Sequence, residues 1–195
     1  MEPDANQRGI NSNDRARSTF CGIPTSVPSM VTPLIMALFP EKAENRSMKE
    51  LNRLIDHSFW ANRKWVEFVY SQKDNDSHPC KLLGHLMVGE RIWFERIDGK
   101  QKTTEMFPLL TREELVAGFE ENLQIYKKLV DGHLDTVIDF KRGSGEEYHA
   151  RVIDILHHLL THGYHHRGQL ATHYARKGVS YPNTDHINFL IENRL

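Results

Sequence analysis

The residues best suited to bind a metal lie close together in one stretch, residues 154–177, which contains six of the chain's 12 histidines. Histidines four positions apart on a helix project from the same face, one turn apart, so that both imidazoles can reach a single ion. Two pairs have this spacing, His158 with His162 and His162 with His166. The stretch therefore predicts a helix that carries at least two metal ligands.

The phase of this helix favours one pair over the other. At about 100° per residue, the apolar side chains form an arc that faces a core, made of Ile155, Leu156, Leu159, Leu160 and Leu170. His162, His166 and His173 lie on the flank of this arc, whereas His158 and His165 point further toward solvent. Ligands at the edge of a core are preorganised and partly shielded from water, so we favour His162 and His166.

The elements that must position these histidines are further amphipathic helices. Residues 47–71 and 80–97 repeat apolar side chains at intervals of three and four. Thr111 and Glu114 have the spacing of a capping box that opens a third helix, to about Gly132. Four long amphipathic segments in one domain predict an all-α fold, a four-helix bundle.

Shorter elements surround the last long helix. Residues 136–140 and 146–150 flank a Gly-Ser-Gly sequence and predict a short β-hairpin just before it. A short helix that ends near Asn193 is expected to close the chain.

Two polar residues interrupt the apolar arc of the helix over 80–97. Glu90 lies near the centre of the apolar arc, where a carboxylate is costly unless it is hydrogen-bonded or neutralised. His85 is partly shielded, and a lone histidine in such a place is more often a core residue than a ligand. It becomes a candidate ligand only if other ligands lie near it.

Composition limits the overall organisation. A chain of 195 residues with 39% hydrophobic and 26% charged residues fits one globular domain, which we expect over 41–195, after a flexible N-terminal extension over 1–40. We also hypothesise that the native protein begins at Met30, Met36 or Met48. No secretory signal is recognisable in the first 20 residues.

Charge and hydropathy exclude several partners. A net charge of -1 provides no positive field for nucleic acid. The longest apolar runs fall short of the roughly 18 residues of a membrane span, so no membrane association is expected. The two cysteines, Cys21 and Cys80, have no metal-binding spacing and fit a cytoplasmic protein.

Three motifs together resemble those of a known family. The sequence H-x-x-x-H-R-G-Q over 162–169 is preceded by H-L-M-V-G-E-R-I-W over 85–93 and by D-H-S-F-W-A-N-R-K-W over 56–65. With the Y-P-N-T-D segment over 181–185, these motifs resemble the DinB-like proteins, the DinB/YfiT superfamily. The resemblance covers about residues 45–190.

The resemblance implies a bundle with an up-down-down-up course, a long crossover, and one divalent metal held by three histidines. By position these are His85, His162 and His166. Three imidazoles suit zinc, nickel or iron and do not identify the metal. The family also implies a possible homodimer, and its members include metal-dependent enzymes that transfer low-molecular-weight thiols.

We therefore predict a metal-dependent enzyme that transfers a small-molecule thiol to a small electrophile, with bound water or thiolate as the nucleophile. The alternatives are a metal-dependent hydrolase and a non-catalytic, metal-stabilised protein of stress responses. Around the ligands we expect three supporting residues, Glu90, Arg167 and Gln169. Glu90 is expected either to support a ligand or to form a buried ion pair, with Arg167 as its preferred partner.

Overall fold

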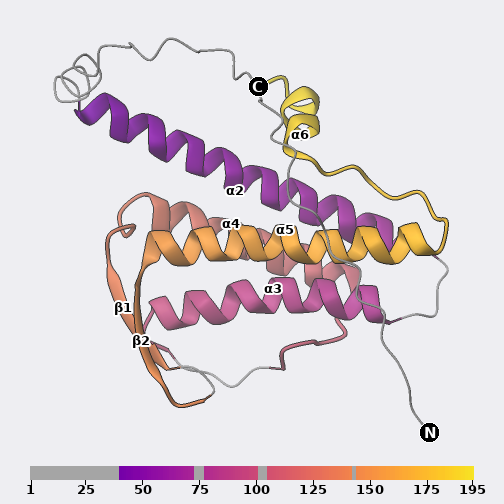
Figure 1. Cartoon of the computed structure of the whole chain (residues 1–195), viewed down its shortest axis with the longest axis horizontal. Helices are drawn as coiled ribbons and strands as arrows, with labels where there is room; N and C mark the ends of the chain where they lie inside the picture. Colours follow the sequence, from indigo (N-terminus) through magenta and orange to yellow (C-terminus); the bar gives the residue numbers. More distant parts are fainter. Residues whose placement is uncertain (1–39, 73–76, 101–104, 142–143) are drawn as a thin grey trace, which may run out of the picture. The chain divides into compact units, whose positions relative to one another are not determined.

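The computed structural model describes residues 40–72, 77–100, 105–141 and 144–195, with only the backbone of 40–45. Its elements, labelled as in Figure 1, are helices α2 (Pro40–Ser71), α3 (His78–Ile97), α4 (Arg112–Val130), α5 (Val152–Arg176) and α6 (His186–Glu192), with strands β1 (Val137–Lys141) and β2 (Glu147–Arg151) between α4 and α5. The four long helices pack against one another, and α6 packs on α2. The predicted extension over 1–40 lies outside the described residues except for Pro40, at which α2 begins.

The four long helices follow an up-down-down-up course. In Figure 1, α2 and α5 run in one direction and α3 and α4 run in the other. After α3, residues 105–111 lead to the start of α4 at Arg112, which lies at the end of the bundle where α3 begins, so that α3 and α4 are parallel. The predicted four-helix bundle and its long crossover are confirmed.

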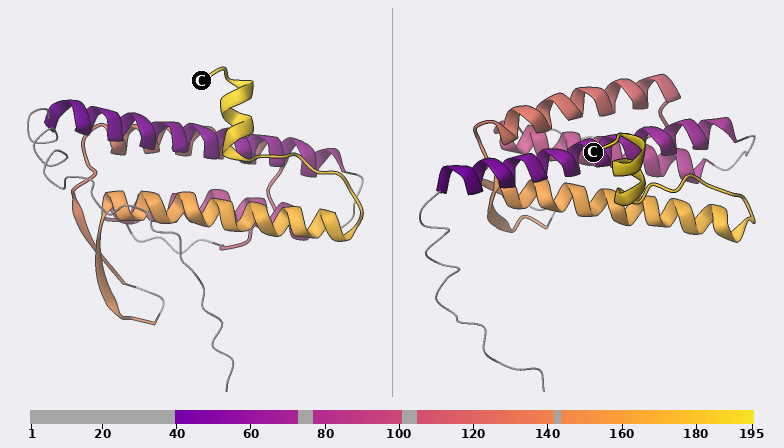
Figure 2. Two further views of the ribbon diagram at one scale, coloured as in Figure 1. Left: turned by 45° about the horizontal axis from the view of Figure 1, so that its top comes forward. Right: turned by 90° about the horizontal axis from the view of Figure 1, so that it is seen from above.

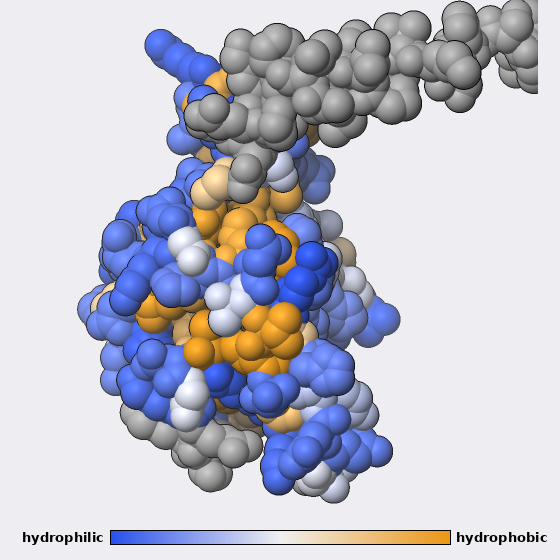
Figure 3. Space-filling view, turned by 90° about the vertical axis from the view of Figure 1, so that its left-hand side faces the viewer, coloured by the Kyte–Doolittle hydropathy of each residue, from blue (hydrophilic) through white to orange (hydrophobic). Residues whose placement is uncertain are grey.

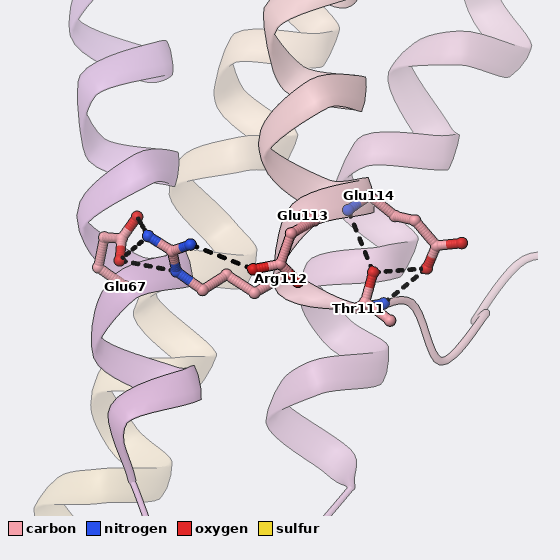
Figure 4. Close-up of polar contacts among 5 residues, drawn as sticks. All are labelled: Glu67, Thr111, Arg112, Glu113 and Glu114. Atoms are coloured by element: carbon pink, nitrogen blue, oxygen red, sulfur yellow. Dashed lines mark hydrogen bonds and ion pairs between the residues drawn. The ribbon is translucent and has the colours of Figure 1, made fainter.

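Local sequence explains where α4 begins. The Oγ1 of Thr111 accepts a hydrogen bond from the backbone N–H of Glu114 at 3.2 Å, and the Glu114 carboxylate accepts one from the backbone N–H of Thr111 at 2.7 Å. This is the predicted capping box, drawn in Figure 4. The adjacent Arg112 forms an ion pair with Glu67 at 2.7 Å and so joins α4 to α2.

The hairpin stands at the end of the bundle where α4 ends and α5 begins (Figure 2). Its strands are antiparallel, with Ile138 opposite Ala150 and Phe140 opposite Tyr148. Each strand starts and ends one residue later than the sequence predicted. Phe140 lies edge-on against Trp93 of α3 at 4.9 Å between ring centres, so the hairpin covers that end of the core.

The core consists of two hydrophobic clusters along the bundle axis. The cluster at the hairpin end includes Ile55, Phe94, Tyr126 and Leu156, and the other includes the buried Trp65. Seen along the bundle from the hairpin end, hydrophobic side chains gather in the middle of the face and hydrophilic ones surround them (Figure 3). Among the described residues, no helix is long and apolar enough to cross a membrane.

A layer of buried polar side chains separates the two clusters. Each of the four long helices contributes to it, and its members are Ser58, Asn62, Glu90, Asn122, His166 and Arg167. Buried polar groups must find hydrogen-bond partners within the protein, so this layer fixes how the helices align lengthwise.

Candidate metal centre

Three histidines from two helices meet at the edge of the polar layer. His162 and His166 lie one turn apart on α5, with 3.0 Å between their Nε2 atoms, and His85 reaches them from α3. One ligand atom from each histidine lies within 4.8 Å of the others. His85 is 7% exposed and His166 9% exposed, and His162 is partly buried. This is a compact and largely buried set of nitrogen donors.

The other ring nitrogens of His85 and His166 are fixed by hydrogen bonds. His85 Nδ1 lies 2.9 Å from the carbonyl oxygen of Met106, which can only accept, so Nδ1 carries the proton. His166 Nδ1 donates to Gln169 Oε1 at 2.7 Å, and the amide nitrogen of Gln169 lies 3.0 Å from Nε2 of His165. These bonds leave Nε2 of both ligands with its lone pair directed to the cluster, as metal binding requires.

The surroundings of the two histidines on α5 favour their neutral form. Burial, together with the neighbouring His166 and His85, lowers the pKa of His162 to about 4. Burial also lowers the pKa of His166 below its usual 6.5, although the hydrogen bond that His166 donates to Gln169 opposes this shift. Neutral imidazole is the form that binds metal, so two of the three donors are held in the binding form.

The sequence between residues 48 and 194 matches the model of the DinB family. This range is most of the chain. The chain belongs to the DinB family. Comparison with curated proteins finds none that matches it. In this DinB protein the histidines at the family-matched positions form the one group among the described residues that could hold a metal ion.

The donor set of this DinB protein fits a divalent transition metal. Three neutral imidazoles suit zinc, nickel and iron, and the hydrogen bonds of His85 and His166 select the nitrogen that would bind. No described cysteine, aspartate or glutamate joins the three histidines. A three-ligand set leaves coordination positions open, which is typical of catalytic sites and not of structural ones.

Glu90 lies in the polar layer but does not form the ion pair predicted with Arg167, since none joins them in the described part of the chain. Its carboxylate accepts hydrogen bonds from Asn122 at 2.8 Å and from Tyr126 at 3.4 Å, both on α4. Burial raises the pKa of Glu90 to about 7, against the effects of Asn122 and Arg167. Because burial favours the neutral form of this carboxyl, and two donors on α4 serve its oxygens, Glu90 does not require a cation as its partner.

Arg167 is held by α2 instead. Its Nη1 donates to Asn62 Oδ1 at 2.7 Å and to Ser58 Oγ at 3.3 Å, and burial lowers the pKa of Arg167 to about 10. The guanidinium also lies over the ring of Tyr164, 4.8 Å from its centre. Arg167 thus fixes the ligand-bearing turn of α5 against α2. Asn62, a buried polar residue of α2, is the main acceptor of its hydrogen bonds.

The other histidines are spread along α5 and beyond. His158 contacts the rings of His162 and Trp93, and His157 is exposed. His173 lies two turns from His166, where its ring faces that of His78. None of them joins the three-histidine group, so the alternative pair of His158 and His162 is not the one that His85 completes.

Two features of the site were missed by sequence reasoning. His57 on α2 is fully buried, with Nδ1 2.9 Å from the Tyr164 hydroxyl and Nε2 2.8 Å from the carbonyl oxygen of Thr184, so it ties the segment before α6 to the bundle. The crossover residues Met106 and Phe107 touch His85. The role of His57 was indicated only by its presence in the motif D-H-S-F-W. Nothing in the crossover sequence predicted that Met106 and Phe107 contact His85.

Proposed function

We propose that this DinB protein is a metal-dependent transferase that moves a low-molecular-weight thiol onto a small electrophile. The observation that supports this most strongly is the convergence of three histidine donors with no fourth protein ligand among the described residues. His85, His162 and His166 would hold the metal, and the open positions would receive the thiol. When bound, a divalent metal lowers the pKa of a coordinated thiol and so supplies thiolate at neutral pH.

The thiol must come from a separate molecule. Cys80, the free cysteine of the described residues, lies in the first turn of α3 and outside the three-histidine group. In the transfer, the thiol sulfur forms a bond with the electrophilic carbon, and the bond from that carbon to its leaving group breaks with the electron pair on the leaving group. The S–H proton passes to solvent.

Residues of this chain position the reaction. Met106 and Gln169 hold His85 and His166 in the orientation that presents Nε2. The nearby Phe107 shields one face of His85, while partly buried His162 leaves the cluster accessible. Partial exclusion of water lowers the local dielectric constant, and this strengthens the interaction of the histidine nitrogens with a metal cation.

The proposal is tested by turnover assays of the zinc-, nickel- and iron-loaded full chain with several thiols and electrophiles. We expect conjugate formation that requires both metal and thiol, and that is lost in His85→Ala, His162→Ala and His166→Ala but kept in His157→Ala, an exposed histidine of the same helix. Product formation without thiol would instead show a hydrolase. Metal-dependent folding with no turnover would show a non-catalytic metal protein.

A further inference from the structure

The crossover segment over 106–110 is held against α3 and α2 at three points. The carbonyl of Met106 accepts from His85 Nδ1 at 2.9 Å, and the carbonyl of Leu110 accepts from the hydroxyl of Tyr70. Between them, Pro108 lies so close to Gly84 that a Cβ at position 84 would overlap the Pro108 carbonyl oxygen. The position of this segment is therefore determined by the helices beneath it.

This segment nevertheless leaves large apolar side chains exposed to solvent, and one of them, Phe107, lies against His85. Met106 is 47% exposed, Phe107 48% and Leu109 61%, and the segment carries no charged residue. Exposed apolar surface costs about 25 cal/mol per Å² relative to burial, and when it is fixed beside a site it commonly serves for binding.

The geometry of Phe107 shows which side is free. Its ring lies flat on that of His85, with 4.2 Å between the ring centres and 9° between the planes, and in the described parts of the chain it stacks on no other ring. One face of Phe107 is covered by His85, so its exposed surface lies on the side away from His85. The exposed face of Phe107 is thus separated from the imidazole of the ligand His85 only by the Phe107 ring itself.

We propose that Met106, Phe107 and Leu109 form the wall that binds the electrophile, and that Phe107 selects an acceptor with an aryl or benzyl group next to its leaving group. The inference rests on the proposed function, because it names the substrate class of the same site. A small molecule is favoured as the occupant, because the wall is continuous with the donor cluster through the stacked rings of Phe107 and His85. The apolar residues of the wall match an uncharged aromatic body.

Direct binding to the zinc-loaded full chain tests this inference without turnover. The probe is 1,3-dinitrobenzene, an aryl compound without a leaving group, titrated by NMR or calorimetry. We expect the dissociation constant to rise about three- to tenfold in Phe107→Ala, as the loss of one aromatic contact predicts. Phe107→Tyr, which keeps the ring, and Ile187→Ala, which removes an apolar side chain on α6 that is more exposed than Phe107, should bind as wild type does.

Phe107 also covers His85, so metal content is measured in every variant. Phe107→Leu keeps an apolar cover without a ring, and it should retain zinc but bind the probe about as weakly as Phe107→Ala. Equal affinity in wild type and Phe107→Leu, or no binding by zinc-loaded wild type, would overturn the inference. Turnover of iodoacetamide, an acceptor without an aromatic ring, tests the proposed function separately, since it does not require the wall.

Discussion

Among single residues, Glu90 has the most unusual environment, a carboxyl inside the bundle whose pKa burial raises from 4.5 to about 7. A group with a raised folded-state pKa binds more protons in the folded protein than in the unfolded one between these two values. The free energy of unfolding therefore falls as pH rises from 4.5 through 7, by about 3 kcal/mol from this group. Glu90 thus accepts the hydrogen bonds of the polar layer, but it lowers stability at neutral and alkaline pH relative to acidic pH.

Glu90→Gln should remove this pH dependence. The amide oxygen can still accept from Asn122, and the side chain at position 90 then carries no charge at any pH. The variant should gain stability relative to wild type by about 3 kcal/mol between pH 4.5 and pH 8, measured by urea unfolding at both values. Contributions from the histidines are common to both proteins and cancel in the difference. A constant difference between the two proteins across this range would refute the assigned pKa.

A second single residue, Gln169, is predicted to contribute to metal affinity through its hydrogen bond with the ligand His166. Its Oε1 accepts the Nδ1 proton of His166, and loss of such a partner typically lowers metal affinity about 10- to 100-fold. Gln169→Ala should therefore weaken zinc binding by about tenfold or more in a chelator competition assay. Thr172→Ala, on the exposed side of the same helix, is the matched control and should bind zinc as wild type does. Equal affinities in all three proteins would remove Gln169 from the site.

At the scale of elements, the contact between α3 and the crossover segment decides how His85 is oriented. Gly84 allows Pro108 to approach, and this approach brings the Met106 carbonyl to His85 Nδ1. The glycine is needed for space and not for an unusual backbone conformation. The crossover is therefore part of the metal centre although it contributes no ligand.

Gly84→Ala should displace the crossover segment. Forcing a methyl group into such a contact typically costs about 1–3 kcal/mol of stability, and breaking the bond from His85 to Met106 should weaken zinc binding as well. Both are measured by denaturation and chelator competition. Gly168→Ala is the control, because a Cβ there meets no atom within 4 Å and alanine favours the helix. If Gly84→Ala matched Gly168→Ala in both measurements, the crossover would have no part in positioning His85.

At the scale of the whole molecule, the three histidines join α3 to α5 across the bundle. A ligand that binds only the folded state stabilises it by about 2.7 kcal/mol at a concentration one hundred times its dissociation constant. Zinc should therefore raise the unfolding midpoint of wild type. His85→Ala leaves the pair on α5 alone and should lose most of this increase. An equal increase in both proteins would place the zinc elsewhere.

Much of this architecture could be predicted from sequence because it depends on local periodicity. The spacing of apolar residues located the bundle helices, the Thr111–Glu114 pair marked the start of α4, and helical phase favoured His162 and His166. His85 could be added only through the family motif, because its proximity to α5 depends on how two helices align that are separated by the 54 residues from 98 to 151. That alignment is a tertiary property of the polar layer.

The errors and omissions have the same origin. Glu90 was expected to pair with Arg167 because both stand on ligand-bearing helices, but each is hydrogen-bonded by a different neighbouring helix, α4 for Glu90 and α2 for Arg167. Phe107 lies in a segment without periodicity, so nothing in the sequence connected it with His85. Contacts between irregular segments and helices follow from packing and leave little trace in local sequence.

The central claim is that His85, His162 and His166 together hold one divalent metal, and elemental analysis of the purified protein tests it most directly. Wild type and His157→Ala should each contain one transition-metal ion per chain, whereas His85→Ala, His162→Ala and His166→Ala should each lose it. All variants are first shown to be folded by circular dichroism. Stoichiometric metal retained in all three variants, or metal absent from wild type supplied with zinc, nickel or iron, would contradict the claim.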